Sequence, residues 1–150
     1  MLKLNVEKLL DEVMVEVKKT ENEIKSVSLL SLAFLGDNIH SLFVREKLVE
    51  SASFKVKDLH SMTTKFVKAS SQSFVLDKIK AILTEEELRI VNSARNSKTN
   101  NIAKNSTIKD YKNATAFESL LGYLGLKNDF ERLRLILNRS YDIILEMSEK

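Results

Sequence analysis

Cysteine and proline are both absent from this sequence of 150 residues. Without cysteine the chain can form no disulfide, use no thiolate nucleophile and hold no zinc through sulfur. We therefore expect a protein of a reducing compartment, the cytoplasm. No apolar run approaches the roughly 18 residues that a membrane-spanning helix needs, so no membrane partner is expected. The first residues, MLKLNVEKLLDEVMVEVKK, alternate charged and apolar side chains, unlike a secretory signal.

Internal repeats, low-complexity tracts and interior linkers are missing as well, which favours one domain spanning residues 1–150. Hydrophobic residues make up 43% of the chain and charged residues 30%, values typical of globular proteins. Apolar residues recur with the 3.6-residue period of an amphipathic helix, and no segment alternates with the period of a strand. The pattern predicts an all-α bundle of about seven helices, at residues 4–19, 28–49, 55–69, 72–82, 84–95, 110–126 and 129–147.

Three segments define the boundaries of these helices. Residues 20–26 read as a polar bridge, so residues 1–27 are expected to form an N-terminal helical extension. Thr84, followed by three glutamates, is a strong helix start, because its hydroxyl can cap the helix and carboxylates suit the first turn. Residues 96–107, rich in Asn, Ser, Thr and Lys, are expected to form a long loop.

Glycine is scarce and occurs only where helices are expected. Gly36 lies in the apolar stretch LAFLGDNI, and Gly122 and Gly125 lie in ATAFESLLGYLGL. Glycine inside a helix costs about 1 kcal/mol relative to alanine, so it needs a reason there. Close approach of another backbone is such a reason. We therefore predict that these two helices cross at short range.

Each of these two stretches also carries one carboxylate among apolar residues, Asp37 in the first and Glu118 in the second. If the helices cross at their glycines, the two carboxylates lie close together and repel each other unless a cation sits between them. Mg²⁺ is bound by one or two carboxylates with waters and substrate phosphates, and such sites hydrolyse phosphodiesters. The alternative is that both carboxylates simply face solvent on separate helices.

The net charge of +3 is unevenly distributed. Residues 55–112 contain 12 Lys and Arg against 6 Asp and Glu, a net charge of +6, and the rest of the chain carries −3. A basic middle segment suits a polyanionic partner such as nucleic acid. A lysine-rich solvated surface would give the same pattern, so this alternative stays open.

Five stretches together resemble the ribonuclease III family. The string AFLGDNIHSLFVREKL (33–48) resembles the signature helix of its catalytic domain, and ATAFESLLGYLGL (114–126) resembles its Phe-Glu-Ala helix. The stretches at 59–72, 84–98 and 104–118 are similar to Mini-ribonuclease III, the short branch without a double-stranded-RNA-binding domain. The resemblance covers roughly residues 28–137 and implies the ribonuclease III endonuclease-domain fold.

The resemblance implies a metal-dependent endoribonuclease that cleaves double-stranded RNA. Asp37 and Glu118 would ligate Mg²⁺, with Mn²⁺ as a substitute, and activated water would leave 5′-phosphate and 3′-hydroxyl ends. The expected substrate is the stem of precursor large-subunit (23S) ribosomal RNA, with an assisting ribosomal protein left open. A homodimer is also implied, and the apolar residues Leu29, Leu30 and Phe34 serve either that interface or the core.

The sequence departs from the full-length family at three carboxylate positions, now Leu30, Ala33 and Thr115. The short branch shares these losses, which leave few carboxylates and imply modest metal affinity. Residues 93–98, SARNSK, also lack the arginine and glycine that begin this motif in the branch, and Ala103 replaces a usual proline. The loop that contacts RNA is therefore less well defined than the carboxylate pair.

Double-stranded RNA is recognised mainly through phosphates and 2′-hydroxyls, which calls for Lys, Arg, Thr, Asn and His. The helix at 59–72 places several such residues on one face, and others border the long loop. Ordinary solvated surface would look the same. We expect RNA contacts from His60, Thr63, Thr64, Lys65, Lys68, Arg95, Asn96, Lys98, Lys104 and Asn105.

Two rival functions remain compatible with the sequence. The same fold could bind RNA without cleaving it, as a ribosome-assembly protein, although the paired carboxylates argue against this. A helical interaction protein with no RNA role is the second rival, and the basic segment at 55–112 argues against it. His40, one turn beyond Asp37, is expected to be a packed or surface histidine, and a supporting role at the site is the alternative.

Overall fold

The structure is a computed structural model that describes residues 19–51, 55–97 and 107–150. Within these ranges the chain is built from α-helices and one short 3-10 helix, and no strand occurs there, which confirms the predicted all-α class. The predicted helix at 4–19 and most of the predicted loop lie outside the described residues. The elements are α2 (Glu21–Ser26), α3 (Leu29–Ser51), α4 (Val56–Val67), α5 (Ala69–Ile79), η1 (Lys80–Ile82), α6 (Glu85–Asn96), α7 (Ile108–Leu126) and α8 (Phe130–Ser148).

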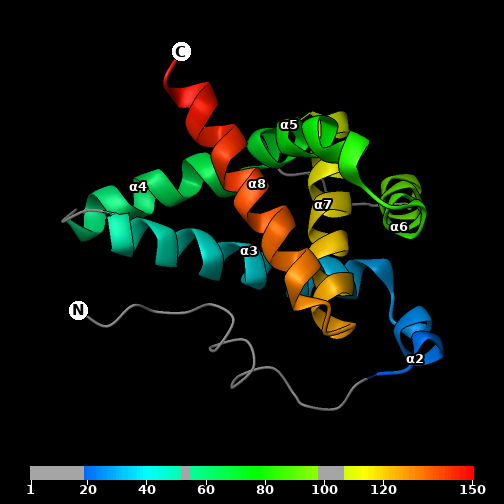
Figure 1. Cartoon of the computed structure of the whole chain (residues 1–150). Helices are drawn as coiled ribbons and strands as arrows, with labels where there is room; N and C mark the ends of the chain where they lie inside the picture. The colour runs from blue at the N-terminus through cyan, green and yellow to red at the C-terminus, as the bar shows by residue number, and fades with distance from the viewer. Residues whose placement is uncertain (1–18, 52–54, 98–106) are drawn as a thin grey trace.

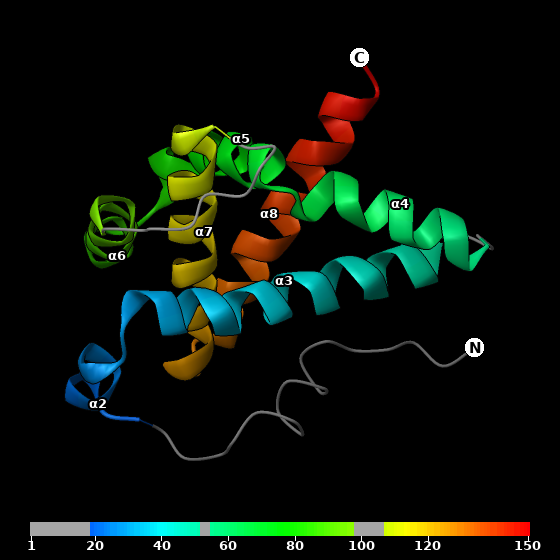
Figure 2. The same cartoon turned by 180° about the vertical axis from the view of Figure 1, so that it is seen from behind.

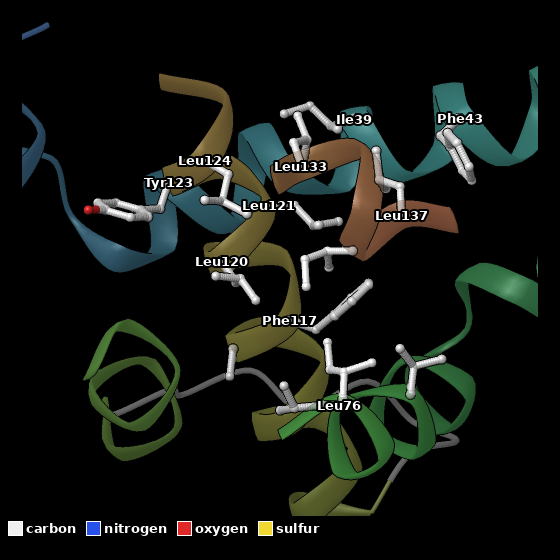
Figure 3. Packing of buried hydrophobic residues seen from close by; sticks show 14 of the residues in the cluster. Ile39, Phe43, Leu76, Phe117, Leu120, Leu121, Tyr123, Leu124, Leu133 and Leu137 are labelled. Atoms are coloured by element: carbon white, nitrogen blue, oxygen red, sulfur yellow. The ribbon is translucent and has the colours of Figure 1, made fainter. Parts of the chain in front are cut away.

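Helix α7 is the centre of the bundle. It crosses the long helix α3 near the N-terminal half of α3, while α5, α6 and α8 pack around it (Figures 1 and 2). Its side chains explain this position: Phe117, Leu120 and Leu121 are fully buried. Figure 3 shows them meeting Leu76 of α5 and Leu133 of α8 in one continuous core. An apolar helix of this kind is stable only when other helices surround it.

Helix starts follow the capping residues. The hydroxyl of Thr84 accepts a hydrogen bond from the backbone N–H of Glu87, whose carboxylate accepts one from the backbone N–H of Thr84. This capping box confirms the predicted start of α6. Thr20 and Glu23 form the same box at α2. The prediction of a polar bridge at 20–26 is therefore wrong: the segment is a capped single-turn helix that buries Ile24.

The junction between α4 and α5 also differs slightly from the prediction. Lys68 has an extended backbone (ψ 152°), so α4 ends at Val67 and α5 begins at Ala69. A break without Pro or Gly leaves no clear sequence signal. The buried residues of α5, including Val75, Leu76 and Ile79, then face α7.

The contact between α3 and α7 is a backbone contact. A Cβ atom at Gly36 would lie 1.7 Å from the carbonyl oxygen of Glu118, and one at Gly122 would lie 2.0 Å from the carbonyl oxygen of Leu32. Both distances are far below any permitted contact, so only glycine fits at either position. The predicted short-range crossing is confirmed, and it is reciprocal: each helix supplies a glycine to the other.

Helix α6 is held to the bundle by an ion pair at Glu87 and by a hydrogen bond at Glu86. Arg132 of α8 binds the buried carboxylate of Glu87, with Nε–Oε2 and guanidinium–Oε1 distances of 2.8 Å, and also donates to the carbonyl of Ile82. The hydroxyl of Tyr123 donates to Glu86 at 2.5 Å. These contacts fix the helix that leads towards residues 98–106. In the part of the chain that is described, no helix is long and apolar enough to cross a membrane.

Candidate functional site

Asp37 and Glu118 lie at the crossing of α3 and α7. The backbone of Glu118 rests directly on Gly36, and Asp37 is the next residue along α3. Asp37 is exposed, whereas Glu118 is largely covered. Two residues that are 81 positions apart in the sequence are thus brought to the same crossing, because the backbone of Glu118 contacts Gly36, the residue before Asp37.

The electrostatics show that the two carboxylates interact. Burial, together with the negative charge of Asp37, raises the pKa of Glu118 to about 8, and a hydrogen bond from Gln72 offsets part of this rise. Among the ion pairs of the described residues, none involves Asp37 or Glu118. A half-buried carboxylate next to another, with no basic partner, is a favourable place for a cation.

The donor set suits a hard divalent cation with open coordination positions. In the described ranges, no group of three or more His, Cys, Asp or Glu residues could enclose a metal ion. At the positions where full-length relatives would carry carboxylates, Leu30 is exposed, Ala33 is buried and the Thr115 hydroxyl donates to the Tyr111 carbonyl. A carboxylate pair that leaves most positions to water and phosphate fits Mg²⁺, which dehydrates reluctantly.

A buried polar pair, Gln72 and His40, lies beside this site. Gln72 is 1% exposed and His40 3%. The side-chain nitrogen of Gln72 is 3.0 Å from Nδ1 of His40, and the imidazole ring meets Phe117 edge to face, with centroids 5.1 Å apart. Burial lowers the pKa of His40 to about 4, so the ring is neutral near pH 7. His40 is therefore packed rather than exposed.

Gln72 is the site residue that sequence reasoning missed. It stands between two serines at the start of α5, in a run that reads as polar surface, yet Ser71, Gln72 and Ser73 are all buried. The helix start at Ala69 rotates these residues towards α7, and the position of that start was not predictable. The only available signal was the spacing of Gln72 from the apolar residues Val75, Leu76 and Ile79, which share its buried face.

Helix α4 presents most of its predicted RNA-contacting residues to solvent. His60, Thr64 and Lys65 of this helix are exposed, and so is Lys68, which directly follows its last residue. Thr63 is not: it is 5% exposed and its hydroxyl donates to the Leu59 carbonyl at 2.7 Å. Thr63 was expected to border this face, but it is buried, because it is three residues before the buried Phe66 and shares its side of the helix.

The remaining predicted contacts lie at or beyond the end of α6. Arg95 is half-buried, and Asn96, the last residue of this helix, is exposed. Lys98, Lys104 and Asn105 lie outside the described residues. Helix α6 therefore directs the chain towards the segment that was expected to contact RNA.

The fold belongs to a known class of nuclease. The Ribonuclease III domain model matches residues 30–129, a range that contains both Asp37 and Glu118. The chain belongs to the ribonuclease III family, within its Mini-ribonuclease 3 branch, and is an endoribonuclease. The all-helical ribonuclease III fold expected from the sequence is thereby confirmed.

Individual relatives cover most of the chain. A Mini-ribonuclease 3 from Thermoanaerobacter sp. (strain X514) is 43% identical over 127 residues, which are 85% of this chain and 89% of the relative. One from Clostridium tetani is 37% identical over 87% of each chain. A crystal structure of a Fusobacterium nucleatum protein superimposes with a TM-score of 0.72 at 33% identity, covering 83% of this chain and 97% of that one.

Proposed function

We propose that this endoribonuclease cleaves double-stranded RNA with Mg²⁺, or Mn²⁺ in its place, held by Asp37 and Glu118. The observation that carries the proposal is the crossing at Gly36, which brings together two carboxylates that form no ion pair with any of the described residues. The proposed substrate in the cell is the base-paired stem of precursor 23S ribosomal RNA, in the cytoplasm.

Each residue of the pair has a defined task in phosphodiester hydrolysis. The exposed Asp37 presents carboxylate oxygens at the surface, where the RNA backbone can approach. Glu118 supplies a second carboxylate from α7, the central helix of the bundle, where the carboxyl group is largely covered. When bound, Mg²⁺ would neutralise charge on the scissile phosphate and activate water for attack. The proposed products carry 5′-phosphate and 3′-hydroxyl ends.

The exposed face of α4 is proposed to bind the RNA backbone. His60, Thr64 and Lys65 of α4, with Lys68 directly after it, provide cationic and hydrogen-bonding groups. This composition suits the phosphates and 2′-hydroxyls of an RNA helix, which are read by shape. Arg95, Asn96 and the residues that follow them would contact the same duplex.

A homodimer is proposed to cut both strands. Phe34 is 77% exposed and Leu30 is 49% exposed. The two residues are four positions apart from each other, so they lie on the same face of α3. Apolar side chains this exposed favour burial against a partner. A second copy of the chain would bring a second carboxylate pair, so each strand of a duplex would meet its own site.

The test of this function is cleavage of an end-labelled RNA duplex at low salt, with Mg²⁺ and with EDTA. Wild type is expected to give staggered cuts that require Mg²⁺, whereas Asp37→Asn and Glu118→Gln are expected to bind the duplex without cutting it. Glu131→Gln, which removes one exposed negative charge from α8, controls for the effect of lost charge on RNA binding alone. Binding without cleavage by wild type would favour the non-catalytic RNA-binding alternative. Such assays, with and without ribosomal proteins, also test whether one of those proteins assists.

A further inference from the structure

Three helices each contribute one side chain to a cluster of polar residues at the α3–α7 crossing. These residues are Gln72 from α5, His40 from α3 and Glu118 from α7. Gln72 lies at its centre. Its side-chain nitrogen is 3.0 Å from Nδ1 of His40, and its amide lies close enough to the Glu118 carboxylate to lower the pKa of that group. An amide NH₂ group carries two N–H bonds, so one can be donated to each partner.

His40 is a fixed anchor for this amide. Its ring is 3% exposed and meets Phe117, the neighbour of Glu118, edge to face. Burial lowers the pKa of His40 to about 4, so the neutral ring offers Nδ1 as an acceptor throughout the neutral range. Because His40 follows Asp37 by one turn of α3, the chain of contacts runs from the Asp37 helix through Gln72 to Glu118.

We propose that Gln72 is a positioning residue of the nuclease site, whose amide, anchored on His40, holds the Glu118 carboxylate where it can share a cation with Asp37. This inference rests on the proposed function of the carboxylate pair. In the described residues, Gln72 is the hydrogen-bond donor that acts on the Glu118 carboxylate, and its amide opposes the rise in the pKa of Glu118 that burial and Asp37 cause. Groups that orient metal ligands typically contribute 10- to 100-fold in metal affinity.

The competing interpretation is that Gln72 merely satisfies the polar interior between α5 and α7. The next residue offers a matched comparison. Ser73 accepts a hydrogen bond from Nδ2 of Asn113 at 3.0 Å, and both residues are buried between the same two helices. Neither residue contacts Asp37 or Glu118 through a hydrogen bond in the described structure. Ser73→Ala therefore removes a buried polar contact of the same interface without touching the site.

The test is Mn²⁺ binding to the RNA-free protein, followed through the EPR signal of the free ion. Gln72→Met keeps the side-chain volume but removes the donors, and we expect its Mn²⁺ affinity to fall about tenfold. Ser73→Ala is expected to bind Mn²⁺ like wild type. In cleavage assays, Gln72→Met should require about tenfold more Mg²⁺ for half-maximal rate, with an unchanged KM for the duplex, and saturating Mg²⁺ should restore kcat. A loss of packing alone would not be restored by metal.

Glu118→Gln separates this proposal from the function on which it rests. If Glu118→Gln binds Mn²⁺ like wild type, the carboxylate pair is not a metal site and both proposals fall. If Glu118→Gln loses Mn²⁺ while Gln72→Met binds it like wild type, the positioning role alone is overturned. If Gln72→Met fails to fold, His40→Phe provides the test. This variant keeps an aromatic ring packed on Phe117 but removes the Nδ1 atom that accepts the hydrogen bond from Gln72. Wild-type Mn²⁺ affinity in His40→Phe would then contradict the proposal.

Discussion

The carbonyl oxygen of Glu118 lies so close to Gly36 that a Cβ atom there would be 1.7 Å away. This single contact determines where the two carboxylates lie, because Asp37 follows Gly36 directly and Glu118 provides the opposing backbone. The same crossing is supported one turn away, where Gly122 faces the carbonyl oxygen of Leu32. The position of the site is therefore a property of the backbone.

Gly36→Ala is expected to destabilise the protein and abolish cleavage. The opposing atom is backbone of a fully packed helix, so α3 and α7 must separate, at a cost of about 2–3 kcal/mol or more in the free energy of unfolding. Gly122→Ala should behave in the same way. Urea denaturation measures the change, with Asn38→Ala on the exposed side of α3 as the control. An equal stability of Gly36→Ala and wild type would show that the helices do not touch here.

The metal-free protein should lose stability as the pH rises from about 4.5 to about 8. Glu118 has a folded-state pKa of about 8 against an ordinary value of 4.5, so in this window the folded protein retains a proton that the unfolded chain has released. Each unit of pKa difference between the folded and unfolded states corresponds to about 1.4 kcal/mol of unfolding free energy. Because the Glu118 carboxyl is partly exposed to solvent, the loss is smaller than the full pKa difference would give. At pH 8.5 the free energy of unfolding of Glu118→Gln should therefore exceed that of wild type by about 2 kcal/mol or more.

Thermal denaturation in EDTA across this pH range is the measurement for Glu118. Glu131→Gln, which removes an exposed glutamate of α8, controls for the loss of one negative charge. Added Mg²⁺ should stabilise wild type at high pH but leave Glu118→Gln unchanged. A difference between wild type and Glu118→Gln that stays constant with pH would contradict this interpretation.

His40 should produce a separate loss of stability in acid. Burial lowers its folded-state pKa from 6.5 to about 4, so below pH 6.5 the unfolded chain takes up a proton that the folded protein refuses. The resulting decrease in the free energy of unfolding should reach about 3 kcal/mol near pH 4. Denaturant titrations of His40→Phe should lack this component, whereas His60→Gln, at the exposed histidine, should retain it. The same acid loss in both variants would argue against a neutral buried His40.

Lys65 of α4 and Lys68, which directly follows α4, are both exposed and should set the salt dependence of RNA binding. A lysine that neutralises one phosphate releases counterions, so removing it lowers the slope of log K against log salt by about one. Lys65→Ala and Lys68→Ala should each show this change in duplex-binding titrations with the catalytically inactive Asp37→Asn background. Thr63→Val, which alters a buried position of the same helix, should leave the slope as it is; a changed slope there would place the RNA on another face.

Glu87→Gln should destabilise the attachment of α6. Glu87 is 3% exposed, and three of its bonds come from Arg132. Removing one member of a buried ion pair leaves the other uncompensated, and because Arg132 is partly exposed we expect a loss of about 1–3 kcal/mol. Chemical denaturation compares it with Glu85→Gln, an exposed residue in the same turn. Equal stability of the two variants would show that the pair contributes little.

Much of this fold follows from local sequence signals. The glycines in apolar helices predicted the crossing of α3 and α7, and Thr84 with the following glutamates predicted the start of α6. The capping box of Thr20 and Glu23 was present in the sequence too, but the segment is so short that its polar residues dominated the pattern. Isolated helices of this length are marginal, and burial of Ile24 against the bundle supports this one.

The site could be predicted only in part. Asp37 and Glu118 stood out as carboxylates in apolar surroundings, whereas Gln72 and Thr63 depend on which face of a helix is buried. That face was misjudged for Thr63, because a hydroxyl that bonds its own helix at Leu59 resembles a solvent-exposed one in sequence. For Gln72 the missing information was the exact break at Lys68, which sets the rotation of α5.

The most direct test of the central claim is anomalous diffraction from crystals grown with Mn²⁺. We expect one strong peak at the crossing of α3 and α7, at coordination distance from a carboxylate oxygen of Asp37 and one of Glu118, and no such peak in Glu118→Gln. A peak that contacts neither residue, or an empty crossing in crystals that bind Mn²⁺ elsewhere, would contradict it.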